Sequence, residues 1–179
     1  TRIKLRAFAG FELPEDIATT GDLAAAYAFG VPMGARLAAS VGSLSLFVWA
    51  VQDPDSAPLA KLQVVKGWIE NGQRQERVYD IACGRSLIDP ATGRCLDNGA
   101  TVNLSDCSWD SAAGSPELRT RWTDPDYASE EDAFYYVRVV QNPTCRWTTF
   151  DSLRLGRAPP SDSPATVTEM AWGSPIWIK

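Results

Sequence analysis

The stretch Ala133-Phe-Tyr-Tyr-Val-Arg-Val-Val-Gln141 decides the fold of this chain, together with Ala171-Trp-Gly-Ser-Pro-Ile-Trp-Ile178 near its end. Even-numbered and odd-numbered side chains of the first stretch form two alternating sets, and both sets are rich in aromatic and β-branched residues. This period of two predicts a β-strand that is packed on both faces. The second stretch predicts a shorter aromatic strand, and we expect the two strands to close a β-sandwich.

Short alternating runs, separated by turn residues, continue through the rest of the chain. They predict further strands at Arg2–Phe11, Ser43–Val51, Lys61–Ile69, Gln75–Ala82, Thr101–Leu104, Glu117–Thr123, Thr166–Ala171 and Ser174–Ile178. Asn71-Gly72 lies between two of these runs and predicts a tight hairpin, because both residues tolerate the positive φ of a type I′ turn. Asp22 predicts the start of a short helix that ends at Gly30, and Gly30–Gly34 predicts a loop.

These elements predict an all-β fold, an immunoglobulin- or fibronectin-III-like β-sandwich with one or two short helices. No repeat and no internal boundary divides the sequence, so residues 1–179 are expected to form a single domain. The chain begins directly in a predicted strand and without methionine. We therefore expect it to be the C-terminal domain of a longer protein.

Composition argues against two classes of partner. The net charge is −5, and lysine and arginine form no long run. Neither nucleic acid nor an anionic membrane is therefore expected as a partner. The longest uncharged run, Leu37–Gln52, contains three serines and is shorter than the roughly 20 apolar residues that a membrane span needs.

The chain contains no histidine, which rules out a Ser-His-Asp triad, a Cys-His dyad and a histidine-ligated metal within it. We expect no catalytic residue, no metal ligand and no cofactor in this fragment, although carboxylate, arginine or tyrosine chemistry remains the alternative. Two Asp-Pro-Asp turns, at residues 53–55 and 124–126, offer oxygen ligands of the kind that calcium prefers. Aspartate before proline more often caps and turns the chain after a strand.

Four cysteines, at positions 83, 95, 107 and 145, lie in turn-rich segments and form no Cys-x-x-Cys pair. Two disulfides fit this placement better than free buried thiols, and they predict a periplasmic or extracellular location. Three connectivities are possible. We favour Cys83–Cys95, which closes a short Gly/Pro-containing loop, and this choice leaves Cys107 with Cys145.

The segment Arg146-Trp-Thr-Thr-Phe-Asp151 is the best candidate for a functional surface. Arg146, Trp147, Phe150 and Asp151 on an irregular segment suit sugar stacking, anion capture or a domain interface. The alternative is a loop whose aromatic side chains fold back onto the core. We expect the Gly30–Leu37 loop, with Met33 and Arg36, to share one apolar interface patch with this segment.

Six segments together resemble the C-terminal region of the domain-of-unknown-function 3604 family. In chain order they are Phe47–Asp55, Val64–Trp68, Val78–Asp80, Trp122–Asp126, Phe134–Val139 and Ala171–Trp177. The resemblance implies a parent protein with an N-terminal PHP-like metallohydrolase barrel whose His and Asp ligands lie upstream of residue 1. Where this family often reads Gly-Val-Pro-Met-Gly-Gly-Asp, the chain has Ala35-Arg36 after the same first five residues, so no acidic role is carried over to this loop.

The resemblance therefore implies an accessory β-sandwich that is not catalytic and whose partner is the barrel domain of the same polypeptide. The alternative is an independent module that binds carbohydrate or another ligand through Arg146, Trp147 and Phe150. A third class, an enzyme that uses the carboxylates of Asp124 and Asp126, is the least favoured.

Overall fold

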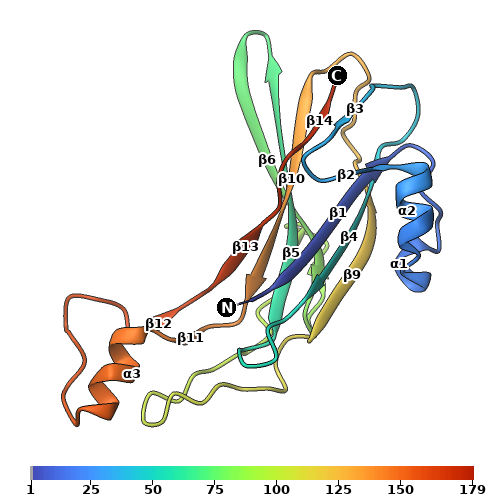
Figure 1. Cartoon of the computed structure of the whole chain (residues 1–179). Coiled ribbons are helices and arrows are strands. Elements are labelled where there is room, and N and C mark those ends of the chain that lie inside the picture. Colours follow the sequence, from blue (N-terminus) through green and yellow to red (C-terminus); the bar gives the residue numbers. More distant parts are fainter. Residues whose placement is uncertain (1) are drawn as a thin grey trace.

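The computed structural model describes residues 2–179, and most of the chain lies in two β-sheets that pack face to face (Figure 1). The first sheet has four strands in the order β2-β1-β4-β9. Their bounds are Lys4–Gly10 (β1), Val31–Pro32 (β2), Ser45–Val51 (β4) and Glu117–Thr123 (β9).

The second sheet has six strands, five of them in the order β3-β14-β10-β5-β6, while β13 also pairs with β10. Every pair is antiparallel except β14 with β3, which are parallel. The bounds are Arg36–Leu37 (β3), Leu59–Glu70 (β5), Gln73–Cys83 (β6), Ala133–Gln141 (β10), Met170–Trp172 (β13) and Ile176–Ile178 (β14). The predicted pairing of β10 with the closing aromatic segment is confirmed.

Three short helices and two small strand pairs complete the fold. Helices α1 and α2 lie against the outer face of the first sheet (Figure 1). Helix α3 projects beyond the end of the sandwich that lies away from the β5-β6 hairpin (Figure 1). The bounds are Ile17–Thr20 (α1), Leu23–Phe29 (α2), Trp147–Arg154 (α3), Ile88–Asp89 (β7), Arg94–Cys95 (β8), Thr144–Cys145 (β11) and Thr166–Val167 (β12). The all-β prediction is confirmed, with one helix more than expected.

The main core lies between the sheets and uses one face of each strand. In β10 this face carries Tyr135, Val137 and Val139, all of them almost fully buried. Phe134 and Tyr136, on the other face of β10, are only half-buried. The prediction that this strand is packed on both faces is therefore confirmed only in part: on the outer face Val140 is buried, whereas Phe134 and Tyr136 are only partly covered.

Two predictions of local structure, the hairpin turn and the start of the helix, are confirmed. Asn71 and Gly72 adopt φ of 50° and 74°, which confirms the tight hairpin between β5 and β6. The Asp22 carboxylate accepts hydrogen bonds from the amides of Ala24 and Ala25, which confirms the start of α2.

Two predictions of local structure were wrong. The expected Gly30–Gly34 loop contains β2, which pairs with β1. Gly30 is extended, and the close approach of the Ala9 carbonyl oxygen leaves no room for a side chain there. The expected strand Thr101–Leu104 is reduced to a single bridge between Val102 and Trp109. In the first case a pairing partner from distant sequence makes the strand, and in the second the single bridge joins residues only seven positions apart.

The structure contains both favoured disulfides, Cys83–Cys95 and Cys107–Cys145, and no free cysteine among residues 2–179. The first attaches the β7-β8 hairpin to the end of β6. The second ties the long segment before β9 to β11, directly ahead of α3. Both therefore anchor excursions that leave the sandwich.

We predict that replacing Cys107 and Cys145 together by serine lowers the free energy of unfolding. The bond closes a loop with a sequence separation of 38, for which the chain-entropy model gives about 4 kcal/mol. Chemical denaturation of the oxidised proteins measures the loss. Alkylation under denaturing, non-reducing conditions should modify no cysteine in the unsubstituted chain, and four modified cysteines would contradict the disulfide assignment.

Candidate functional site

Helix α3 carries the surface that the sequence singled out. The predicted loop is helical from Trp147 onward, and Arg146 occupies the position just before the helix. Trp147 is 68% exposed and Phe150 is 37% exposed, so neither aromatic side chain folds back onto the core. Asp151 is exposed on the same helix. The core alternative for this segment is therefore wrong.

The polarity of α3 is inverted relative to an ordinary surface helix. Its buried residues are Thr149 and Ser152, and their hydroxyls donate to the carbonyl oxygens of Ala165 (2.7 Å) and Thr148 (2.8 Å). Surface helices normally turn their apolar residues inward and their polar residues outward. Here the aromatic side chains face solvent and the hydroxyl groups are satisfied inside.

Met33 and Arg36 do not join this surface. They lie near β2 and β3, at the opposite end of the molecule from α3 (Figure 1). Met33 is half-buried against the main core, and its sulfur lies close to Gly173, whereas Arg36 is exposed on β3. The prediction of one shared apolar patch is wrong, because the sandwich separates the two segments.

A groove that sequence analysis missed lies on the outer face of the second sheet, at the end where the β5-β6 hairpin projects (Figure 1). Its volume is about 480 Å³. Phe134 and Trp177, which are cross-strand partners in β10 and β14, lie along it. Trp177 is also the register partner of Arg36 in β3. Charged groups from β6 and from the flanking segments complete the lining: Arg74, Glu76, Asp132 and Lys179.

The buried ionisable groups between the sheets form a closed cluster. Lys66 is 2% exposed, and its Nζ lies 3.3 Å from Asp124 and 3.0 Å from Glu131. The hydroxyl of Tyr135 donates to Asp124 at 2.6 Å. Burial, followed by this bond to a carboxylate, raises the pKa of Tyr135, so the phenol stays a proton donor. Each of these groups is therefore paired with another inside the sandwich.

Both Asp-Pro-Asp turns use their first aspartate as a cap. Asp124 Oδ1 accepts the amide of Asp126 at 2.9 Å, and Asp53 Oδ1 accepts the amide of Asp55 at 3.1 Å. These bonds confirm the interpretation as turns. Within residues 2–179 no group of three or more Cys, Asp or Glu side chains is placed to hold a metal ion.

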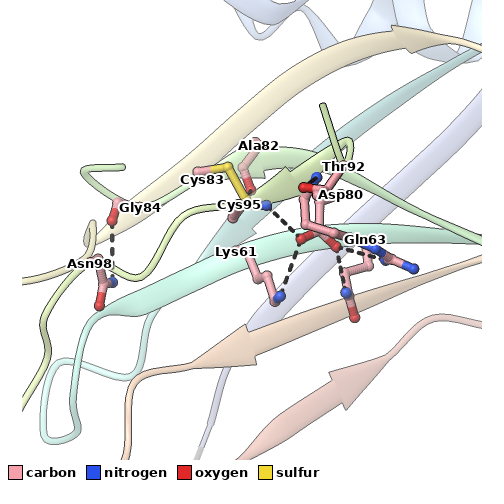
Figure 2. The surroundings of a disulfide bond; sticks show 10 residues. Lys61, Gln63, Asp80, Ala82, Cys83, Gly84, Thr92, Cys95 and Asn98 are labelled. Atoms are coloured by element: carbon pink, nitrogen blue, oxygen red, sulfur yellow. Dashed lines mark hydrogen bonds and ion pairs between the residues drawn. A yellow bond between two sulfur atoms is a disulfide. The ribbon is translucent and has the colours of Figure 1, made fainter. Parts of the chain in front are cut away.

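A second polar hub lies beside the first disulfide (Figure 2). The buried carboxylate of Asp80 accepts hydrogen bonds from Gln63 (2.6 Å), from the Cys95 amide (2.9 Å) and from Lys61 (3.1 Å). Burial alone raises the pKa of Asp80, but these three donors outweigh it, so the pKa lies below its usual value. Asp80 therefore fastens the β7-β8 hairpin to the outer face of the second sheet.

These features define a class of protein: an all-β sandwich with two disulfides, with paired charges in its interior and with aromatic side chains exposed on its surface. The sequence model for the family described as "Protein of unknown function (DUF3604)" matches residues 1–179, so the chain belongs to this family, as its segments predicted. No curated protein and no solved structure matches the chain. No helix of the described residues is long and apolar enough to cross a membrane.

We predict that Lys66→Met destabilises the fold by about 3–5 kcal/mol, since it leaves the buried Asp124 carboxylate without its cation. The matched control is Arg77→Met, which removes an exposed ion pair with Asp126 and should cost at most about 1 kcal/mol. Urea denaturation compares the two. A Lys66→Met chain as stable as the control would show that Lys66 is not needed for packing.

We also predict a pH-dependent role for Asp80. Its folded pKa is lowered, so its contribution is complete above its unfolded pKa of about 3.9 and is lost as the pH falls through the folded value. The difference in unfolding free energy between the unsubstituted chain and Asp80→Asn should be constant near neutral pH and shrink below about pH 4. A difference that stays constant down to pH 3 would contradict this linkage.

Proposed function

We propose that residues 1–179 form a non-catalytic accessory domain that docks through α3 against another domain of the same polypeptide, a PHP-like metal-dependent hydrolase barrel. The inverted polarity of α3 carries this proposal. Its outward Trp147 and Phe150 lie one turn apart, so both can enter one pocket of a partner surface. The resemblance of the sequence to the C-terminal region of such proteins supports the choice of partner.

The composition of this surface suits an interface. Tryptophan and arginine are enriched among the residues that dominate binding energy, and Trp147 follows Arg146 directly. Burying one large aromatic side chain contributes about 1.5–3 kcal/mol. Cys145, immediately before Arg146, is bonded to Cys107, so the helix starts from a fixed point and loses little freedom on docking.

The state of the ionisable groups supports a non-catalytic role. Lys66, Asp124 and Tyr135 are buried and bonded to one another, and Asp80 is saturated by donors. General acid–base catalysis needs a group that reaches the substrate. We therefore infer that the reaction of the parent protein takes place in the barrel, on metal ligands upstream of residue 1.

We further infer that the sandwich is of the immunoglobulin or fibronectin-III type. In chain order β1, β4, β5, β6, β9, β10 and β13/β14 correspond to strands A, B, C, C′, E, F and G. The observed neighbours then reproduce the A-B-E and G-F-C-C′ sheets of that fold. Tyr135, near the start of β10, bonds back to Asp124, much as the tyrosine corner does before strand F.

Two disulfides support a periplasmic or extracellular location, because such bonds persist in oxidising compartments. In that setting the domain would fold as a stable cap on the barrel.

Docking through α3 predicts a selective effect of Trp147→Ala. In the full-length gene product this change should separate the thermal transitions of the two domains and expose their linker to protease. In residues 1–179 alone it should change the free energy of unfolding by less than about 0.5 kcal/mol, because the side chain is already exposed. Scanning calorimetry and limited proteolysis measure both effects.

The control is Trp172→Ala, because Trp172 is 61% exposed but lies on β13 of the second sheet and not on α3. It should leave domain coupling unchanged. Uncoupling by Trp172→Ala but not by Trp147→Ala would move the interface to the outer sheet face. Turnover of phosphodiesters or phosphomonoesters by residues 1–179 with added Mn²⁺ or Zn²⁺ would overturn the non-catalytic role.

A further inference from the structure

The groove on the outer face of the second sheet has an aromatic floor, in which the rings of Phe134 and Trp177 are tilted by 50° to each other. Phe134 lies across the backbone of Gly67, its register partner in β5, and any side chain at position 67 would collide with the ring. The rings of Phe134 and Trp177 have centroids 5.3 Å apart, and Tyr136 lies nearly parallel to Phe134 at 6.4 Å. Phe134 and Trp177 therefore line the groove, and Tyr136 continues the aromatic row along β10, on the part of this face that the β7-β8 hairpin leaves free.

The absence of a side chain at position 67 makes this floor possible. Glycine is unfavourable within a strand, and it often marks a place where a ring or ligand must approach the backbone. Here it leaves room for the distal edge of the Phe134 ring, which occupies the space that a Cβ at position 67 would need. The floor stays open, since Trp177 is 39% exposed in the structure.

The rim of the groove carries charges of both signs. Arg74 and Glu76 project from β6 on the same face as Phe134, since the register pairs Glu76 with Gly67 and Arg74 with Ile69. Asp132 and Lys179 line the groove as well. All four side chains are exposed, and the Nζ of Lys179 lies over the Trp177 ring, 5.9 Å from its centroid, so a ring stacked on that side of Trp177 would take the place of this ammonium group.

We propose that this groove binds a neutral saccharide, with sugar rings lying on Phe134 and Trp177 and hydroxyl groups bonded to the charged rim. Aromatic faces accept the C–H face of a pyranose, while carboxylates accept from its hydroxyls and cations donate to its oxygens. The volume, about 480 Å³, lies within the range of small-ligand sites. This site differs from α3, and it does not depend on how α3 docks.

The distribution of charge favours a neutral ligand. Two cations and two anions border the groove, so a charged ligand would meet one pair of like charge at close range. A purely apolar partner would remove water from all four charged groups without replacing its hydrogen bonds, which costs free energy. A polyhydroxylated neutral ring avoids both penalties.

The test uses residues 1–179 and four neutral hexasaccharides: cellohexaose, xylohexaose, maltohexaose and chitohexaose. Isothermal titration calorimetry should detect saturable binding of at least one of them. Trp177→Ala should weaken that binding by about tenfold or more, as expected when a stacking platform is lost. Gly67→Ala should also weaken it, because the new methyl group displaces the Phe134 ring.

Two exposed tryptophans outside the groove serve as controls, and Trp147→Ala and Trp172→Ala should bind like the unsubstituted chain. Circular dichroism and thermal melting verify that each variant is folded. Absence of saturable binding at millimolar saccharide would overturn the proposal, as would equal losses in Trp177→Ala and Trp172→Ala. Concentration-dependent dimerisation that Trp177→Ala abolishes, seen by analytical ultracentrifugation, would instead assign the groove to a second copy of the chain.

Discussion

The buried ammonium group of Lys66 constrains much of this fold. It lies between the two sheets, and an unpaired charge in that position costs several kcal/mol. Its carboxylate partners are Asp124, directly after β9, and Glu131, two residues before the start of β10. The connection between the two sheets must therefore pass over the Lys66 end of β5. That path also brings Tyr135 to Asp124, which fixes where β10 enters the second sheet.

Much of the fold could be predicted from local chemistry. Asn71-Gly72 defines the hairpin because few other pairs adopt two consecutive positive φ angles, and Asp22 defines a helix start because its carboxylate accepts two amides. The cysteine pairing followed from loop closure. Segments whose structure depends on a distant partner were not predictable. The Gly30–Gly34 segment becomes β2 only because β1 offers a free edge.

The two candidate surfaces also differ in how far they could be predicted from the sequence. Trp147 and Phe150 could be singled out because they are neighbours in sequence, although their helical state and their exposure to solvent could not be predicted. The groove was missed because its residues come from β5, β6, β10 and β14. One signal was present: the even-numbered aromatic residues of β10 alternate with the core residues. Sequence alone could not show that this second face is covered at one end and open at Phe134.

The sandwich places its two exposed aromatic surfaces at opposite ends, α3 at one and the groove at the other (Figure 1). Protein interiors are close-packed and hardly compressible, so the sandwich is expected to behave as a rigid body. The distance between the two surfaces is then set by the length of β5 and β10. A domain fixed through α3 would therefore hold the groove outward, clear of its partner. The same geometry that separates Met33 and Arg36 from Trp147 thus allows docking and ligand binding to occur together, without competition for one surface.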